Sequence, residues 1–129
     1  MTSSMSTSTD AKRAIVGVVV AALAFAVPAG SQAATTPGLI ASVGPGYTIS
    51  LKTTAGRKVR TLQRGTYAIT VRDRSRQHDF RLRGPGLSRV LSSVAAVGTK
   101  TVTVRLGAGT YEFLCQPHAS AMRGAFSAR

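Results

Sequence analysis

This sequence has little of several residue types, and each shortage restricts what the protein can be. Its 129 residues include one cysteine, two histidines and no tryptophan, and only 5% of them are aromatic. A single cysteine excludes an intrachain disulfide, so the chain must fold on a hydrophobic core alone. The few aromatic residues argue against nucleic-acid binding by base stacking, although the net charge of +13 would suit it.

The chain also lacks an apolar run long enough for a permanent membrane anchor. Residues 14–27 form an uninterrupted apolar run of 14 residues after Lys12 and Arg13, whereas a membrane-spanning helix needs about 20. The polar start, the apolar run and the small residues that follow it are typical of a signal peptide. Ser31 and Ala33 favour cleavage after Ala33, so residues 1–33 are predicted to be a signal peptide and the protein to be secreted or extracytoplasmic, associated with the cell envelope.

Cleavage there would leave one domain of 96 residues with a strong positive charge. It removes Lys12, Arg13 and Asp10 and leaves 15 basic and three acidic residues, a net charge of about +12. Such a charge favours an acidic redox partner protein or an anionic envelope component as the partner. We expect a monomer with no permanent membrane span and no nucleic-acid partner.

The remaining chain has the pattern of an all-β domain. Residues 34–46 are rich in Gly, Pro and Thr and are predicted to be a loose lead-in segment, before a domain at 47–129. Apolar and polar residues then alternate in several short segments separated by glycine-rich turns, as in half-buried strands. Those segments begin near Tyr47, Tyr67, Phe80, Val102, Tyr111 and Ala125. Many short strands at this spacing predict a β-sandwich or barrel, and residues 88–97 could be a helix, an irregular strand or a loop.

Four residues of this domain form a set that suits a metal. Cys115, His118 and Met122 lie within eight residues, and His78 is the only other histidine. His78 shares the parity of the inward-facing Phe80, so its side chain is predicted to reach the end of the core. One thiolate, two imidazoles and a weak axial thioether are the ligands of a type 1 (blue) copper site.

Each of these residues also has an ordinary explanation. A lone cysteine can be a buried core residue, a histidine can be a polar group at a strand end, and a methionine can fill space in the core. Zinc is the main competing metal, but its structural sites rarely use methionine. Because these four residues are all the Cys, His and Met outside the predicted signal peptide, we predict that they bind one copper ion, Cu(I) or Cu(II).

The same residues resemble the cupredoxin family, specifically the small plastocyanin-like domains of secreted bacterial proteins. The resemblance covers nearly the whole mature chain and lies in residues 78–86, 98–104 and 109–124. It implies a Greek-key β-sandwich of the cupredoxin type, with copper near one end bound by His78, Cys115, His118 and Met122. The sequence departs from the family at Asp79, where many plastocyanin-like proteins have an asparagine that helps to hold the cysteine loop.

These observations lead to three alternative functions. The first is single-electron transfer in the extracytoplasmic space, with His118 as the partly exposed edge through which electrons pass and residues 84–87 with Pro117 as a flat docking surface. The second is copper storage or delivery, and the third is a non-redox interaction module that uses its basic surface. We expect no enzymatic activity, because copper enzymes with a blue site need further copper centres and the chain has no histidine left for them.

Overall fold

The computed structural model describes residues 17–26, 30 and 34–129, and the chain divides into the units Met1–Gln32 and Ala33–Arg129. In the first unit, the described residues form neither a helix nor a strand. No helix in the described part of the chain has the length and apolar character needed to cross a membrane. The rest of the predicted signal peptide, including its cleavage site, lies outside the described residues.

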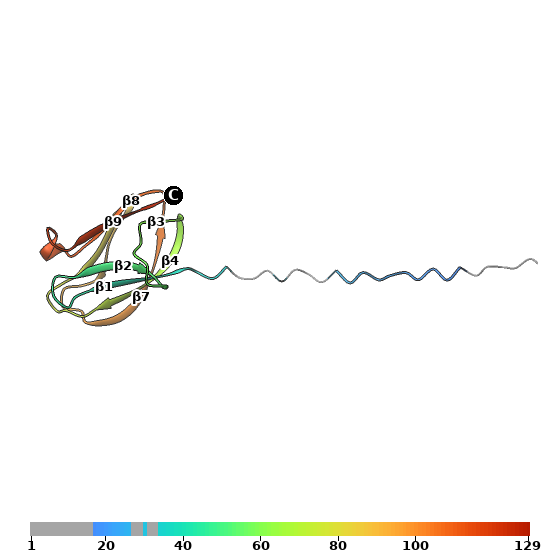
Figure 1. Ribbon diagram of the computed structural model, residues 1–129, viewed down its shortest axis with the longest axis horizontal. Helices are drawn as coiled ribbons and strands as arrows, with labels where there is room; N and C mark the ends of the chain where they lie inside the picture. The colour runs from blue at the N-terminus through green and yellow to red at the C-terminus, as the bar shows by residue number, and fades with distance from the viewer. Residues whose placement is uncertain (1–16, 27–29, 31–33) are drawn as a thin grey trace, which may run out of the picture. The chain divides into compact units, whose positions relative to one another are not determined.

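The second unit is a sandwich of two β-sheets (Figure 1). One sheet has the order β2-β1-β4-β7 and the other has the order β3-β9-β8-β5-β6. The pairs β1–β4 and β3–β9 are parallel, and the remaining pairs are antiparallel. The strands are β1 Gly38–Val43, β2 Ile49–Thr53, β3 Thr61–Leu62, β4 Gly65–Asp73, β5 Phe80–Gly84, β6 Leu87–Ser92, β7 Gly98–Leu106, β8 Gly109–Leu114 and β9 Arg123–Ala128, and a short 3-10 helix, η1, spans Gln116–His118. The predicted all-β sandwich is confirmed.

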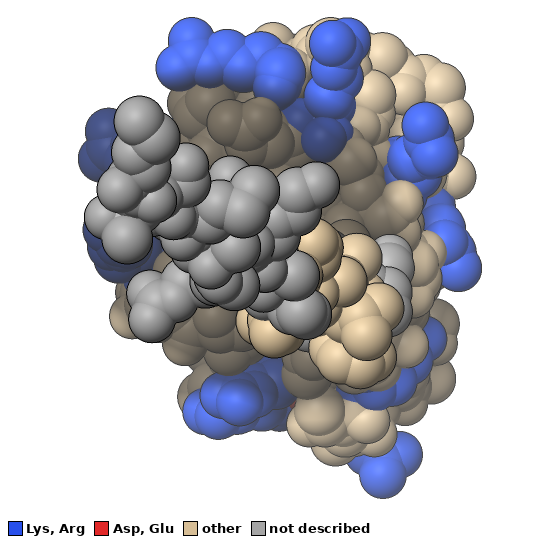
Figure 2. Space-filling model, turned by 90° about the vertical axis from the view of Figure 1, so that its right-hand side faces the viewer, with Lys and Arg blue, Asp and Glu red and all other residues tan. Residues whose placement is uncertain are grey.

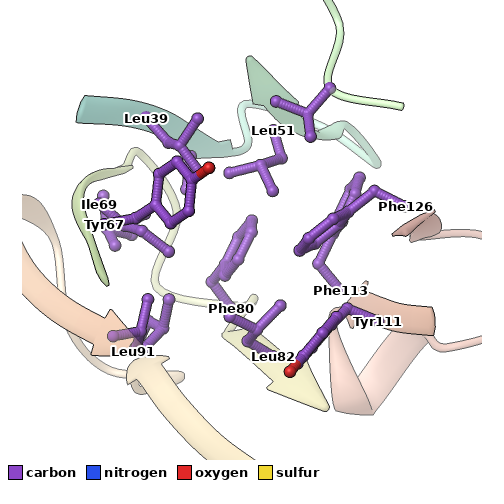
Figure 3. Packing of buried hydrophobic residues seen from close by; sticks show 14 of the residues in the cluster. Leu39, Leu51, Tyr67, Ile69, Phe80, Leu82, Leu91, Tyr111, Phe113 and Phe126 are labelled. Carbon is purple, nitrogen blue, oxygen red and sulfur yellow. The ribbon is translucent and has the colours of Figure 1, made fainter. Parts of the chain in front are cut away.

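The predicted alternation fills the space between the sheets. In β4, for example, Tyr67, Ile69 and Val71 are buried while Arg72 is exposed. Two pairs of stacked aromatic rings lie in the core, Phe80 with Phe113 and Tyr111 with Phe126 (Figure 3). Burial of side chains of this size supplies most of the stability of a domain that has no disulfide.

One segment differs from the sequence-based expectation, and for another the structure decides between the alternatives. Residues 34–46 are not a loose lead-in, because they contain β1, which pairs with β2 on one side and β4 on the other. Its inward residues Leu39, Ala41 and Val43 are buried, but the small Ala41 and the flanking glycines weaken the apolar pattern. Residues 88–97 are strand β6 followed by a turn rather than a helix.

Two tyrosines fix the turns that precede long strands. The hydroxyl of Tyr67 donates a hydrogen bond to the Gln63 carbonyl oxygen at 2.6 Å, and that of Tyr111 donates to the Gly107 carbonyl oxygen at 3.1 Å. Both bonds reach back four residues, as in the tyrosine corner of β-sandwiches. They allow each ring to lie in the core while its polar atom is satisfied by the backbone.

A buried carboxylate joins the two sheets near the end of the sandwich where the histidines lie. Asp73, the last residue of β4, is 3% exposed and accepts a hydrogen bond from the Ser92 hydroxyl in β6. It also accepts one from the Ser75 backbone N–H at 3.0 Å. Asp73 therefore ties the opposite sheet to the first turn of the segment that leads to His78.

We predict that Asp73→Ala destabilises the protein more than a neighbouring surface change does. The substitution leaves the Ser92 hydroxyl and the Ser75 N–H without their acceptor, at a cost of about 2–3 kcal/mol. The control is Arg72→Ala, at an exposed position of the same strand, which should change stability by less than about 0.5 kcal/mol. Urea unfolding of both variants measures the difference, and equal losses would show that the Asp73 bonds contribute nothing.

Candidate metal centre

Two loops deliver the predicted ligands to one end of the sandwich. His78 lies in the loop between β4 and β5, Cys115 follows β8 directly, and His118 ends η1. The antiparallel register pairs Arg81 with Leu114, so the start of β5 lies beside the end of β8. This pairing brings His78 and Cys115 together although they are far apart in the sequence.

The donor atoms of these residues form a compact triangle. The Nδ1 atoms of His78 and His118 are 3.0 Å apart, and the Cys115 Sγ is 3.7 Å from each of them. The point equidistant from these three atoms lies about 2 Å from each, which is close to the bond length between a first-row metal and imidazole nitrogen. The geometry therefore fits one metal ion in the plane of two nitrogens and one sulfur.

Backbone hydrogen bonds close the loop that carries the other ligands. The Cys115 N–H donates to the Met122 carbonyl oxygen at 3.0 Å, and the Met122 N–H donates to the His118 carbonyl oxygen at 2.8 Å. Pro117 lies in the first turn of η1, where a missing N–H costs nothing. Met122 is fully buried at the end of this loop, and its role as an axial ligand remains a prediction.

Burial differs among the four residues. His78 is 2% exposed and Cys115 is 0% exposed, whereas His118 is half-buried. Of the three residues in the group, His118 is therefore the one that reaches the solvent. The three-atom group is the one cluster of at least three His, Cys, Asp or Glu side chains with metal-binding spacing among the described residues.

Asp79, next to His78, binds the loop that follows Cys115. Its carboxylate accepts a hydrogen bond from the Gln116 backbone N–H at 2.6 Å and pairs with Arg81 at 3.0 Å. The residue after His78 thus reaches the loop after Cys115, which is the contact expected of an asparagine at this position. The negative charge is buried, and Arg81 balances part of it.

Two sequence-based expectations need correction, one on the docking surface around His118 and one on Tyr47. Residues 84–87 form the turn between β5 and β6, at the opposite end of β5 from His78, so they cannot surround His118. Tyr47 is not an inward strand residue, because β2 begins only at Ile49 and the Tyr47 side chain is 68% exposed. Its ring lies beside both imidazoles, with a centroid 4.9 Å from that of His118 and 5.6 Å from that of His78.

The sequence contained a signal for this position of Tyr47. Gly44, Pro45 and Gly46 precede it, and such a run favours a turn rather than a strand. The alternation of Tyr47 with Ile49 and Leu51 therefore made the predicted strand begin two residues too early. The two residues brought together with Cys115 were predicted, but their aromatic neighbour was missed.

Comparison with known proteins places the fold. No family model matches the chain, and no curated protein matches it. Among solved structures, rusticyanin from Thiobacillus ferrooxidans has 23% identity and a TM-score of 0.51, covering 76% of this chain and 80% of that one. A variant of rusticyanin has 21% identity and a TM-score of 0.53 over the same shares, and another structure describes rusticyanin as a copper protein, with 21% identity and a TM-score of 0.51.

The chain therefore has the cupredoxin fold, as rusticyanin does. Its two histidines and one cysteine form a group of the kind that is typical of type 1 copper sites. The family that the sequence resembles is thus confirmed at the level of the fold.

The thiol of Cys115 has a raised pKa in the folded protein. Burial is the main cause, and the charge of the Asp79 carboxylate acts in the same direction, while backbone N–H groups of Asp79 and His118 oppose it. Without a metal, the folded protein therefore keeps the thiol protonated at pH values where the unfolded chain, with a pKa of about 8.5, begins to ionise. The resulting stabilisation is complete below the unfolded pKa and is lost as the pH rises through the folded pKa.

We predict that metal-free protein loses stability above about pH 8.5 and that Cys115→Ser removes this part of the pH dependence. Asp79→Asn keeps an oxygen to accept the Gln116 N–H but removes the charge, so the pKa of Cys115 should fall. Ultraviolet titration of the thiolate and denaturant unfolding across pH measure both effects. If Cys115 titrates alike in the folded and the unfolded protein, burial does not control it.

Proposed function

We propose that this protein binds one copper ion in a type 1 site and carries single electrons. The observation that carries the proposal is the triangle of the His78 Nδ1, His118 Nδ1 and Cys115 Sγ atoms, 3.0–3.7 Å apart. Two imidazoles and a thiolate in one plane are the equatorial set of blue copper sites, and Met122 would supply the thioether of such a set. Zinc, the main competitor, seldom has a methionine ligand.

Each of the four side chains would have its own role in such a site. Cys115 would give up its proton to bind as the thiolate, and both imidazoles would bind as neutral groups through Nδ1. Copper, when bound, supplies a one-electron couple between Cu(I) and Cu(II). The hydrogen-bonded loop from Cys115 to Met122 and the Asp79 bond to Gln116 hold the ligands in one arrangement, which keeps reorganisation on electron transfer small.

A carrier suits these residues better than an enzyme. His118 is the half-buried ligand, and its ring gives an electron a short route between the surface and the buried site. Catalysis in copper enzymes with a blue site would need further copper centres, and the chain has no third histidine to build one. We therefore propose electron transfer and no enzymatic activity.

We infer an acidic redox protein as the partner of this carrier. The three carboxylates in residues 34–129 are used internally: Asp73 and Asp79 are buried, and Glu112 pairs with Arg83 and Arg123. Lys and Arg side chains also lie around the face drawn in Figure 2, which is the right-hand side of Figure 1 and faces away from residues 115–122, and no Asp or Glu is visible there. Arg74 and Arg76 are exposed in the loop that carries His78, so the attraction of an acidic partner would act near the ligands.

We also propose that the protein acts outside the cytoplasm. The support is the sequence of residues 1–33, whose basic, apolar and small-residue regions follow in the order of a signal peptide. Export also makes the lone Cys115 explicable, because a free thiol in an oxidising compartment is protected when it is buried and bound to a metal. The protein would then acquire copper after export.

We predict that the purified protein, loaded with Cu(II), shows an intense visible band from thiolate-to-copper charge transfer at one copper per chain. Cys115→Ser and His78→Ala should abolish the band, because each removes an equatorial ligand. Met122→Leu is the matched control: it keeps the volume and the equatorial ligands, so the band should persist while the redox potential shifts. A loaded protein without the band would overturn the type 1 assignment.

We predict further that charge near His118 governs electron exchange with small reagents. Oxidation of the reduced protein by ferricyanide should slow as the ionic strength rises, whereas oxidation by a cationic cobalt complex should accelerate. Arg74→Glu should slow the ferricyanide reaction several-fold. Arg64→Glu makes the same charge change before β4, at the other end of the sandwich, and should have a smaller effect. Equal effects of the two variants would argue against docking at the His118 end.

A further inference from the structure

Tyr47 is the one exposed aromatic side chain in residues 34–129. The other five aromatic residues of this range, Tyr67, Phe80, Tyr111, Phe113 and Phe126, are buried in the core. Tyr47 is 68% exposed, so it contributes little to the core. A large aromatic group left at the surface of a small domain is a candidate for a functional role.

The ring of Tyr47 lies against both imidazoles of the candidate metal centre. It is T-shaped to the His118 ring, with an interplanar angle of 85° and a centroid distance of 4.9 Å. It is tilted by 54° relative to the His78 ring at 5.6 Å. Edge-to-face pairs at these distances are favourable aromatic contacts. One side of Tyr47 therefore covers the ligands, and much of the rest of its surface faces the solvent.

The loop that carries Tyr47 is held in place from within. Gly44 and Gly46 have φ angles of 70° and 65°, which other residues rarely adopt. The Gly44 N–H donates to the Thr48 carbonyl oxygen, and the Thr48 hydroxyl donates to the Pro45 carbonyl oxygen, both at 2.8 Å. These bonds close the loop into a tight turn and fix the direction in which Tyr47 leaves it.

The same loop packs against the segment that carries His78. A Cβ atom added at Gly44 would lie 2.9 Å from the Ser75 Cβ, so the two loops are in direct contact. The Arg74 N–H also donates to the Val43 carbonyl oxygen at 2.9 Å. The position of Tyr47 relative to His78 is therefore set by the fold and does not depend on the aromatic contact alone.

We propose that Tyr47 is a cap on the metal centre that slows the escape of the metal and the entry of small chelators and reagents. This inference rests on the proposed copper site. His118 is the ligand nearest the solvent, and the Tyr47 ring covers part of the surface by which a competing ligand would approach it. Because the contact is made by the ring and not by its hydroxyl, a phenylalanine should serve equally well.

The test compares Tyr47→Ala and Tyr47→Phe with the parent. Each protein is loaded with copper, reduced and mixed with a membrane-impermeant Cu(I) chelator, and the release of copper is followed by absorbance. Tyr47→Ala should keep the visible band of the oxidised form but release Cu(I) about tenfold faster, equivalent to about 1.4 kcal/mol. Tyr47→Phe should release it at the parent rate. Val90→Ala is the matched control, since Val90 is another exposed apolar side chain, on β6, and it should change nothing.

A second readout needs no metal. Diethyl pyrocarbonate modifies accessible imidazoles, and mass spectrometry locates the modified residue. In metal-free protein, His118 should react faster in Tyr47→Ala than in the parent and Tyr47→Phe, while His78, which is 2% exposed, should stay slow in all three.

The two readouts separate the cap from the copper site itself. If the parent binds copper with the expected band but Tyr47→Ala changes neither release nor modification, the cap is wrong and the proposed function stands. If no variant acquires the band but His118 becomes reactive in Tyr47→Ala, the cap is supported and the type 1 assignment fails.

Discussion

The antiparallel pairing of β5 with β8 is the interaction on which the rest of the site depends. It sets Arg81 opposite Leu114, and the residues just beyond these ends are His78 and Cys115. A shift of the register by one residue would turn every side chain of one strand to the opposite face. Phe80 and Phe113 stack in the core on this pair of strands, so the packing that stabilises the sandwich also fixes the register that assembles the ligands.

Buried carboxylates hold the segment that carries His78 at both ends. Asp73 accepts bonds from Ser92 and from the Ser75 N–H at the start of the segment, and Asp79 accepts one from the Gln116 N–H just after His78. Each carboxylate connects this segment to a different element, β6 in one case and the cysteine loop in the other. Because Asp73 and Asp79 are buried, they add no negative charge to the surface, and the domain presents an almost purely basic surface. The burial of these two carboxylates therefore both holds the segment in place and makes the surface basic.

The sequence predicted the grouping of His78, Cys115 and His118 because these residue types are rare in the chain and two of them lie close together in the sequence. Cys115 and His118 lie in one tight loop, and His78 follows from parity with Phe80, so all three needed only strand geometry. Other features depended on tertiary contacts. Strand β1 was missed because its pattern rests on Ala41, whose burial is decided by the neighbouring strands and not by its own size. Residues 84–87 were expected near His118 because they follow His78 closely in the sequence. Strand β5 runs away from the site, however, and puts them at its other end. Tyr47 was assigned to the core because alternation cannot tell the last residue of a turn from the first residue of a strand.

The loop contacts explain how a small sandwich without disulfides keeps the donor atoms of His78, Cys115 and His118 in one arrangement. Backbone bonds hold the segments that carry these residues: the Arg74 N–H donates to the Val43 carbonyl oxygen of β1, and within the loop from Cys115 to Met122 the Cys115 N–H donates to the Met122 carbonyl oxygen and the Met122 N–H to the His118 carbonyl oxygen. The donor positions are thus determined by main-chain bonds, and the side chains need little rearrangement to bind. A centre built in this way loses little conformational entropy when it binds a metal, so the free energy of the ligand bonds is available to stabilise the fold. With a metal bound, binding and folding would then reinforce each other.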